Sequence, residues 1–107
     1  MTEEFRFQEL PAAKDRGFWI VTAAMKRFEL DFPEEHEFDV RAIAIALANE
    51  NRYVGHTSIP YSVAQHAVLV SDWLMQETDD AVIAYQGLHH DDAEFVTGDI
   101  PSPVKKW

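Results

Sequence analysis

Residues 90–94 carry the side chains best suited to metal chemistry. His90, Asp91 and Glu94 fall on one run that we expect to be helical. At 100° per residue, Asp91 lies about 100° from His90 and Glu94 about 40° from it, so an imidazole and two carboxylates share one arc. Burying them together is costly, and a divalent cation can balance both nitrogen and oxygen ligands. The run predicts a metal site; the alternative is an exposed helix face that is merely polar.

A second histidine, His66, lies on another predicted helix and strengthens this interpretation. Its own face of that helix carries the apolar side chains Val63, Val70 and Trp73, which predicts that His66 points inward. An inward histidine is commonly a core residue with a satisfied hydrogen bond. Two facing helices that each carry such a histidine, one beside an aspartate, favour a metal site instead.

The elements that must position these residues are mainly helices. Residues 18–23 and 27–30 are β-branched and aromatic and predict one small hairpin near the N-terminus. Asp39 is placed to cap a helix over residues 40–52, and residues 55–61 predict a loop. We therefore expect a mainly α fold with a short N-terminal β-hairpin.

Two further predicted helices carry the candidate residues. Ser62 and Gln65 have the spacing of a capping box, and the helix that they begin runs through VAQHAVLVSDWLMQ. Thr78 or Asp79 is placed to cap the next, a continuous helix over residues 80–97. A glycine suited to a C-terminal turn and two prolines follow it, so the helix is expected to stop there.

Composition bounds the fold and the partners. The 107 residues predict one domain, residues 1–17 predict an irregular arm, and the lack of cysteine excludes disulfides and thiol nucleophiles. With 9 Lys and Arg against 19 Asp and Glu, the net charge of −10 repels phosphate backbones, so we expect no nucleic-acid partner. No apolar run approaches the roughly 18 residues of a membrane helix, and the acidic start has no signal-peptide pattern. We expect a cytoplasmic chain with no membrane partner.

Two segments together resemble a known family. PYSVAQHAVLVS (60–71) and LHHDDAEFVTGDIPSPVK (88–105) are similar to the HD-domain metal-dependent phosphohydrolases. The similarity is strongest to the branch of small bacterial and phage enzymes that includes 5′-deoxynucleotidases and some deoxynucleoside-triphosphate hydrolases. It extends over about residues 18–105 and implies the first part of an HD-domain helical bundle.

The resemblance assigns metal and catalytic roles residue by residue. His66 matches the family's first metal-binding histidine, and His90 and Asp91 match the doublet that names the family. Glu94 matches a carboxylate implicated in catalysis near the attacked phosphorus. Asp99, in GDIP, matches a second carboxylate that takes part in catalysis or positions the substrate.

The resemblance also implies substrate contacts. Arg52 matches an arginine that contacts the substrate phosphate, and Tyr53 follows where an aromatic side chain can pack on the nucleoside. Lys105 matches a downstream basic residue and is a further candidate for a phosphate contact. Trp19 is a candidate for stacking on a base, with a core or anchoring tryptophan as the alternative.

The activity that the resemblance implies is metal-dependent hydrolysis of deoxynucleoside mono- or triphosphates, with a metal-activated water attacking phosphorus. Manganese, cobalt, zinc, iron and magnesium all serve the family, and mixed nitrogen and oxygen ligands do not choose among them. Family members are commonly dimers or larger, so we expect a homo-oligomer. The alternatives are a degenerate domain that binds nucleotide or a partner without catalysis, and a fragment whose exposed apolar faces drive association.

One ligand of the family's metal site has no counterpart. The family supplies its last ligand, an aspartate, from a later helix, and this chain stops at Trp107. We expect residues 1–107 to form a single HD-type domain without the family's C-terminal helices. The chain is then a fragment of a longer protein or a truncated, inactive relative.

Overall fold

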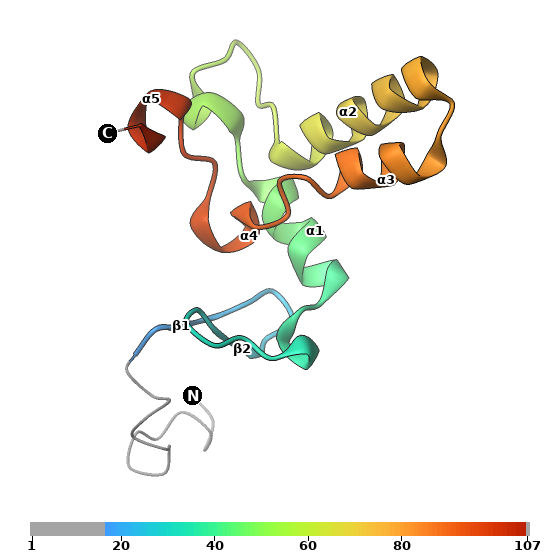
Figure 1. Cartoon of the computed structure of the whole chain (residues 1–107). Helices are drawn as coiled ribbons and strands as arrows, with labels where there is room; N and C mark the ends of the chain where they lie inside the picture. Colours follow the sequence, from blue (N-terminus) through green and yellow to red (C-terminus); the bar gives the residue numbers. More distant parts are fainter. Residues whose placement is uncertain (1–16, 107) are drawn as a thin grey trace. The chain divides into compact units, whose positions relative to one another are not determined.

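A computed structural model describes residues 17–106 (Figure 1). Within them the chain is mainly helical with one short antiparallel hairpin, which confirms this part of the predicted fold. The predicted irregular arm lies outside the described residues, apart from Gly17. The described residues fall into two compact units, one up to Asp39 and one from Val40 onward. In chain order the elements are β1 (Trp19–Val21), β2 (Arg27–Glu29), the 3-10 turn η3 (Glu35–Glu37), α1 (Val40–Asn49), the 3-10 turn η4 (Arg52–Gly55), α2 (Val63–Thr78), α3 (Ala81–Leu88), α4 (Glu94–Thr97) and α5 (Ser102–Lys105).

The hairpin belongs to the first unit. β1 and β2 pair antiparallel with Ile20 opposite Phe28, as their β-branched and aromatic residues predict. Phe28 is buried, and its ring meets that of Phe38 edge to face with 5.1 Å between centroids. This aromatic pair gives the small hairpin an apolar face to pack against, which two strands need for stability.

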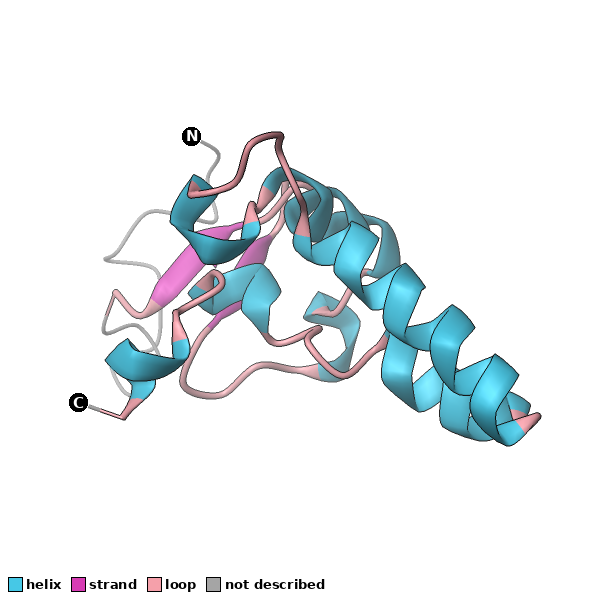
Figure 2. Cartoon of the chain, turned by 90° about the horizontal axis from the view of Figure 1, so that it is seen from above, coloured by secondary structure: helices cyan, strands magenta, loops and turns pink. Residues whose placement is uncertain are grey.

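The second unit is built around a helical hairpin. α2 and α3 run antiparallel side by side, and α1 packs against α2 and α4 (Figures 1 and 2). Gly87 permits the close approach of α3 to α2, because a side chain there would collide with Leu74. Trp73 is 60% exposed, so the apolar face predicted for α2 does not extend to it. The buried apolar residues of this unit are small or aliphatic: Ala42, Leu47, Val63, Ala67 and Ala84.

The ends of α2 are set by local hydrogen bonds. The predicted capping box is present: the Ser62 hydroxyl accepts from the Gln65 N–H at 3.1 Å, and the Gln65 side chain accepts from the Ser62 N–H at 2.8 Å. The prediction that Thr78 or Asp79 caps α3 is wrong, because Asp79 ends α2 in the left-handed region with φ of 50°. Asp80 takes the role, and its carboxylate accepts the backbone N–H groups of the first turn of α3.

The continuous helix predicted over residues 80–97 is also wrong, since α3 ends at Leu88. In a continuous helix the Gly87 carbonyl would accept the N–H of Asp91. Here that carbonyl faces Nδ1 of the His90 imidazole at 2.5 Å. The backbone then follows a 3-10 pattern, in which the Glu94 N–H donates to the carbonyl of Asp91, three residues back. His90 and Asp91 therefore lie on a turn between α3 and α4, and Glu94 begins α4, so the three do not share one helix face.

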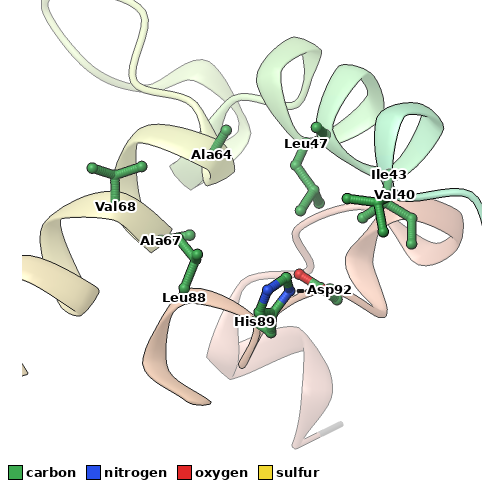
Figure 3. Close-up of a pocket in the computed structure, with 10 residues that line it drawn as sticks. Val40, Ile43, Leu47, Ala64, Ala67, Val68, Leu88, His89 and Asp92 are labelled. Atoms are coloured by element: carbon green, nitrogen blue, oxygen red, sulfur yellow. Dashed lines mark hydrogen bonds and ion pairs between the residues drawn. The ribbon is translucent and has the colours of Figure 1, made fainter. Parts of the chain in front are cut away.

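An apolar pocket of about 250 Å³ opens between α1, α2 and the turn that follows α3 (Figure 3). His89 and Asp92 are its polar members, and His89 Nδ1 lies 2.7 Å from Asp92 Oδ2. The other lining residues are Val40, Ile43, Ala44, Leu47, Ala64, Ala67, Val68 and Leu88.

Over residues 17–106, no helix combines the length and apolar character that crossing a bilayer requires.

Candidate metal centre

A second, polar pocket of about 480 Å³ lies within the helical unit. It is lined by η4, the first turns of α2, the turn after α3, the start of α4, and the segment from Asp99 through α5. The structure brings together here the candidate residues from residue 52 onward: Arg52, Tyr53, His66, His90, Asp91, Glu94, Asp99 and Lys105. Trp19 belongs to the other unit, where the Arg27 guanidinium lies 4.7 Å from the centre of its ring. Base stacking by Trp19 stays a prediction.

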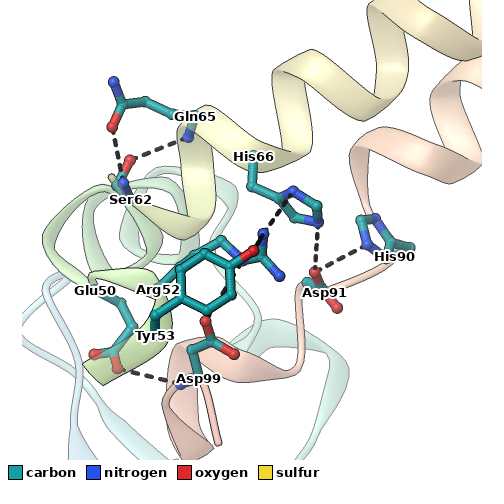
Figure 4. A network of polar contacts seen from close by, with 9 residues as sticks. All are labelled: Glu50, Arg52, Tyr53, Ser62, Gln65, His66, His90, Asp91 and Asp99. Atoms are coloured by element: carbon teal, nitrogen blue, oxygen red, sulfur yellow. Dashed lines mark hydrogen bonds and ion pairs between the residues drawn. The ribbon is translucent and has the colours of Figure 1, made fainter. Parts of the chain in front are cut away.

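Three potential metal ligands converge in this pocket. One nitrogen each from His66 and His90 and one oxygen from Asp91 lie within 4.8 Å of one another. Asp91 Oδ2 is 2.9 Å from Nε2 of His90 and 3.7 Å from Nε2 of His66 (Figure 4). α2 supplies His66 and the turn after α3 supplies the other two, so the packing of α2 on α3 creates the set.

The hydrogen bond of His90 indicates which ring nitrogen is available. The Gly87 carbonyl can accept but not donate, so Nδ1 of His90 carries the proton at this contact. Nε2 of the same ring lies 2.9 Å from Asp91 Oδ2. A proton on Nε2 or a cation held between the two atoms accounts for this approach, since two bare lone pairs would repel. A backbone carbonyl behind the ring is also how proteins commonly orient a metal-binding histidine, so the donor set fits a divalent cation.

Arg52 is the cation that holds the other side of the pocket. Its Nε lies 3.6 Å from Asp99 Oδ2, and its guanidinium lies 4.7 Å from the ring centre of Tyr53 and 5.9 Å from that of Tyr61. One of its terminal nitrogens is 3.3 Å from Nδ1 of His66. A guanidinium has donors only, so this nitrogen of His66 accepts.

These surroundings favour the neutral form of His66. Burial, followed by the Arg52 guanidinium, lowers the pKa of His66 from its usual 6.5, against a smaller raising effect of the Asp91 carboxylate. A metal ion binds neutral imidazole, but a neutral His66 that accepts from Arg52 at Nδ1 carries its proton on Nε2, the nitrogen that faces Asp91. Coordination through Nε2 therefore requires the other tautomer and loss of the Arg52 contact.

The backbone beside Arg52 is strained. Tyr53 and Val54 both adopt left-handed conformations, with φ of 58° and 53°. A β-branched residue such as Val54 rarely does so, at a cost of about 1–3 kcal/mol. The Arg52 N–H donates to the Tyr61 carbonyl at 2.8 Å, which ties this turn to the start of α2. The helix predicted over residues 40–52 ends at Asn49 instead, and Arg52 begins this 3-10 turn.

Glu94 has the environment of an acid that can keep its proton. Its Oε2 is buried and has no hydrogen-bond partner among the described residues. Burial, and then the Asp91 and Asp99 carboxylates, raise the pKa of Glu94 above its usual 4.5; Lys105 opposes the rise. Such a carboxyl group can exchange a proton with a water or a leaving oxygen in the pocket.

One residue of this region escaped the sequence reasoning. The backbone N–H of Asp99 donates to Oε1 of Glu50 at 3.1 Å (Figure 4). Glu50 stands 49 positions away, just after α1, and no short motif connects the two. Its acidic type alone does not distinguish it from the other carboxylates of this acidic chain.

Comparison with known proteins gives a relative but no activity. No protein-family model matches the chain. Over 88 residues the chain is 40% identical to YfdR of Escherichia coli (strain K12), which is described as an uncharacterized protein. The match takes in 82% of this chain and 47% of YfdR, so the chain spans about half the length of this curated relative.

Proposed function

We propose that the chain carries the metal and phosphate site of an HD-domain phosphohydrolase that acts on nucleotides. The observation that carries the proposal is the convergence of His66, His90 and Asp91 within 4.8 Å, in a pocket that also holds Arg52. Two imidazoles and a carboxylate suit a divalent transition metal, and a guanidinium suits a phosphate. The resemblance over residues 60–71 and 88–105 supports the same assignment.

The roles follow from the positions of the side chains. His66, His90 and Asp91 would hold the cation. When bound, a divalent cation lowers the pKa of a water and polarises a phosphoryl oxygen. Arg52 offers a fork of donors to the phosphate and offsets its charge in this acidic chain.

The remaining residues complete the pocket around the substrate. Glu94, with its raised pKa, accepts a proton from the attacking water or returns one to the leaving oxygen. Asp99 orients Arg52 through their ion pair. Tyr53 is 54% exposed beside Arg52, where its ring can pack on the nucleoside, and Lys105 lies at the pocket edge as a second phosphate contact.

The test is a hydrolysis screen of this chain. A panel of ribo- and deoxynucleoside mono- and triphosphates is incubated with manganese, cobalt or magnesium, with and without a chelator. We expect chelator-sensitive release of phosphate or pyrophosphate, lost in Asp91→Ala and retained in Asp72→Ala, an exposed aspartate of α2. Nucleotide binding without turnover would favour the non-catalytic alternative. If the chain shows no nucleotide binding and no turnover with any metal, the proposal is overturned.

A further inference from the structure

Glu50 connects parts of the chain that meet at the pocket. Through its side chain it accepts the backbone N–H of Asp99, with 3.1 Å between nitrogen and Oε1. Through its backbone it accepts the N–H of Val63 at 2.8 Å, and Val63 is the fully buried first residue of α2. The next turn of α2 carries His66. Glu50 thus joins the end of α1 to the start of α2 and to the Gly98–Asp99 segment.

Gly98 makes room for this contact. Its φ of 76° lies in the region that favours glycine, and a Cβ atom added there would come within 3.2 Å of Glu50 Oε1. The carboxylate therefore sits close against the backbone of the segment whose N–H it accepts. A charged acceptor makes a stronger bond to an N–H than a neutral one.

The contact between Glu50 and Asp99 affects the position of Arg52, because Asp99 also pairs with Arg52. The Asp99 carboxylate pairs with Arg52 Nε at 3.6 Å, while the Asp99 backbone is held by Glu50 (Figure 4). Glu50 is a negative group, so it does not itself attract an anion. Its contribution is to fix the position of the Asp99 backbone. Asp99 in turn sets the direction of the Arg52 guanidinium.

We propose that Glu50 is a positioning residue for the phosphate-binding arginine. It fixes the Gly98–Asp99 backbone so that the Asp99 carboxylate holds the Arg52 guanidinium toward the pocket. The proposal rests on the proposed function in one respect, that the anion which Arg52 meets is the phosphate of a nucleotide.

The test compares Glu50→Ala and Glu50→Gln with the wild-type chain, and uses Glu77→Ala, at an exposed position near the end of α2, as the matched control. Glutamine keeps an oxygen that accepts the Asp99 N–H, so it should rescue what alanine loses. The first readout is amide hydrogen exchange of Asp99 by NMR. We expect exchange about tenfold faster in Glu50→Ala, from loss of a hydrogen bond to a charged group, and close to wild-type rates in the other two variants.

The second readout separates positioning from general damage. Glu50 makes no hydrogen bond or ion pair to His66, His90 or Asp91 and reaches His66 only indirectly, through Asp99 and Arg52. Mn²⁺ affinity should therefore change by less than about threefold in all variants. The affinity for 2′-deoxyadenosine 5′-monophosphate should fall about tenfold in Glu50→Ala and less than about threefold in Glu50→Gln. Unchanged Asp99 exchange in Glu50→Ala, equal nucleotide affinities of the alanine and glutamine variants, or parallel loss of Mn²⁺ affinity would overturn the proposal. A wild-type chain that binds Mn²⁺ but no nucleotide would overturn the proposed function, while Asp99 exchange would still report whether Glu50 holds that segment.

Discussion

Two histidine–aspartate pairs lie next to each other in residues 89–92, and their surroundings differ. His90 Nε2 and Asp91 Oδ2 are 2.9 Å apart in the polar pocket, across from His66. His89 Nδ1 and Asp92 Oδ2 are closer still, at 2.7 Å, but they line the apolar pocket (Figure 3). Among the described residues, the first pair joins a third potential ligand and the second does not.

The comparison shows that the third partner distinguishes the two pairs. A short histidine–aspartate contact is by itself an ion pair or hydrogen bond of modest energy when partly exposed. The His90–Asp91 pair can contribute to a metal site because α2 brings His66 beside it, and because Arg52 and Asp99 make the rest of that pocket polar. The His89–Asp92 pair lines a pocket with aliphatic side chains from α1, which offer no ligand atoms.

The largest expected effect separates the two aspartates. Asp91→Ala should weaken Mn²⁺ binding by at least about 100-fold, because loss of a ligand exceeds the 10–100-fold cost of losing an outer contact. Asp92→Ala, the matched control, should leave Mn²⁺ affinity within about threefold, since its carboxylate faces the apolar pocket. Isothermal titration calorimetry measures both. Equal losses in the two variants would mean that the pairs are not distinct.

A smaller effect is expected from the apolar pocket. Leu47 is 4% exposed and lines that pocket, so Leu47→Ala enlarges an existing space. We expect a loss of about 2 kcal/mol in the free energy of unfolding, at the low end for such a change because Leu47 already borders that space. Val82→Ala, at a position 65% exposed on α3, should change it by less than about 0.5 kcal/mol. Urea unfolding gives both values, and the folded Leu47→Ala chain should keep its Mn²⁺ affinity. A matching loss of that affinity would couple the two pockets.

The smallest expected effect is a pH dependence that sharpens the role of His66. Its pKa in the folded chain lies below the usual 6.5, so the unfolded chain binds that proton more readily. The stability that neutral His66 contributes is present above pH 6.5 and is lost as the pH falls below it. Without metal, Tm should therefore fall more between about pH 7.5 and about 5.5 in the wild-type chain than in His66→Gln. Thermal unfolding with a chelator present measures the difference, and identical slopes would contradict the assignment.

The sequence by itself determined the features that depend on neighbours along the chain. The capping box of Ser62 and Gln65 joins residues three apart, and the hairpin pairs segments close in sequence. Such bonds form through local backbone geometry, so residue type and spacing are sufficient to predict them. The types of the candidate site residues were readable for the same reason.

The tertiary structure decided where those types meet. The end of α3 at Leu88 arises because the His90 imidazole competes for the Gly87 carbonyl, which the periodicity of apolar residues does not encode. His66 reaches Asp91 only through the packing of α2 on α3, and Glu50 reaches Asp99 across 49 positions. Contacts between distant residues depend on how whole elements pack, because many sequences bury the same apolar surface with different polar neighbours.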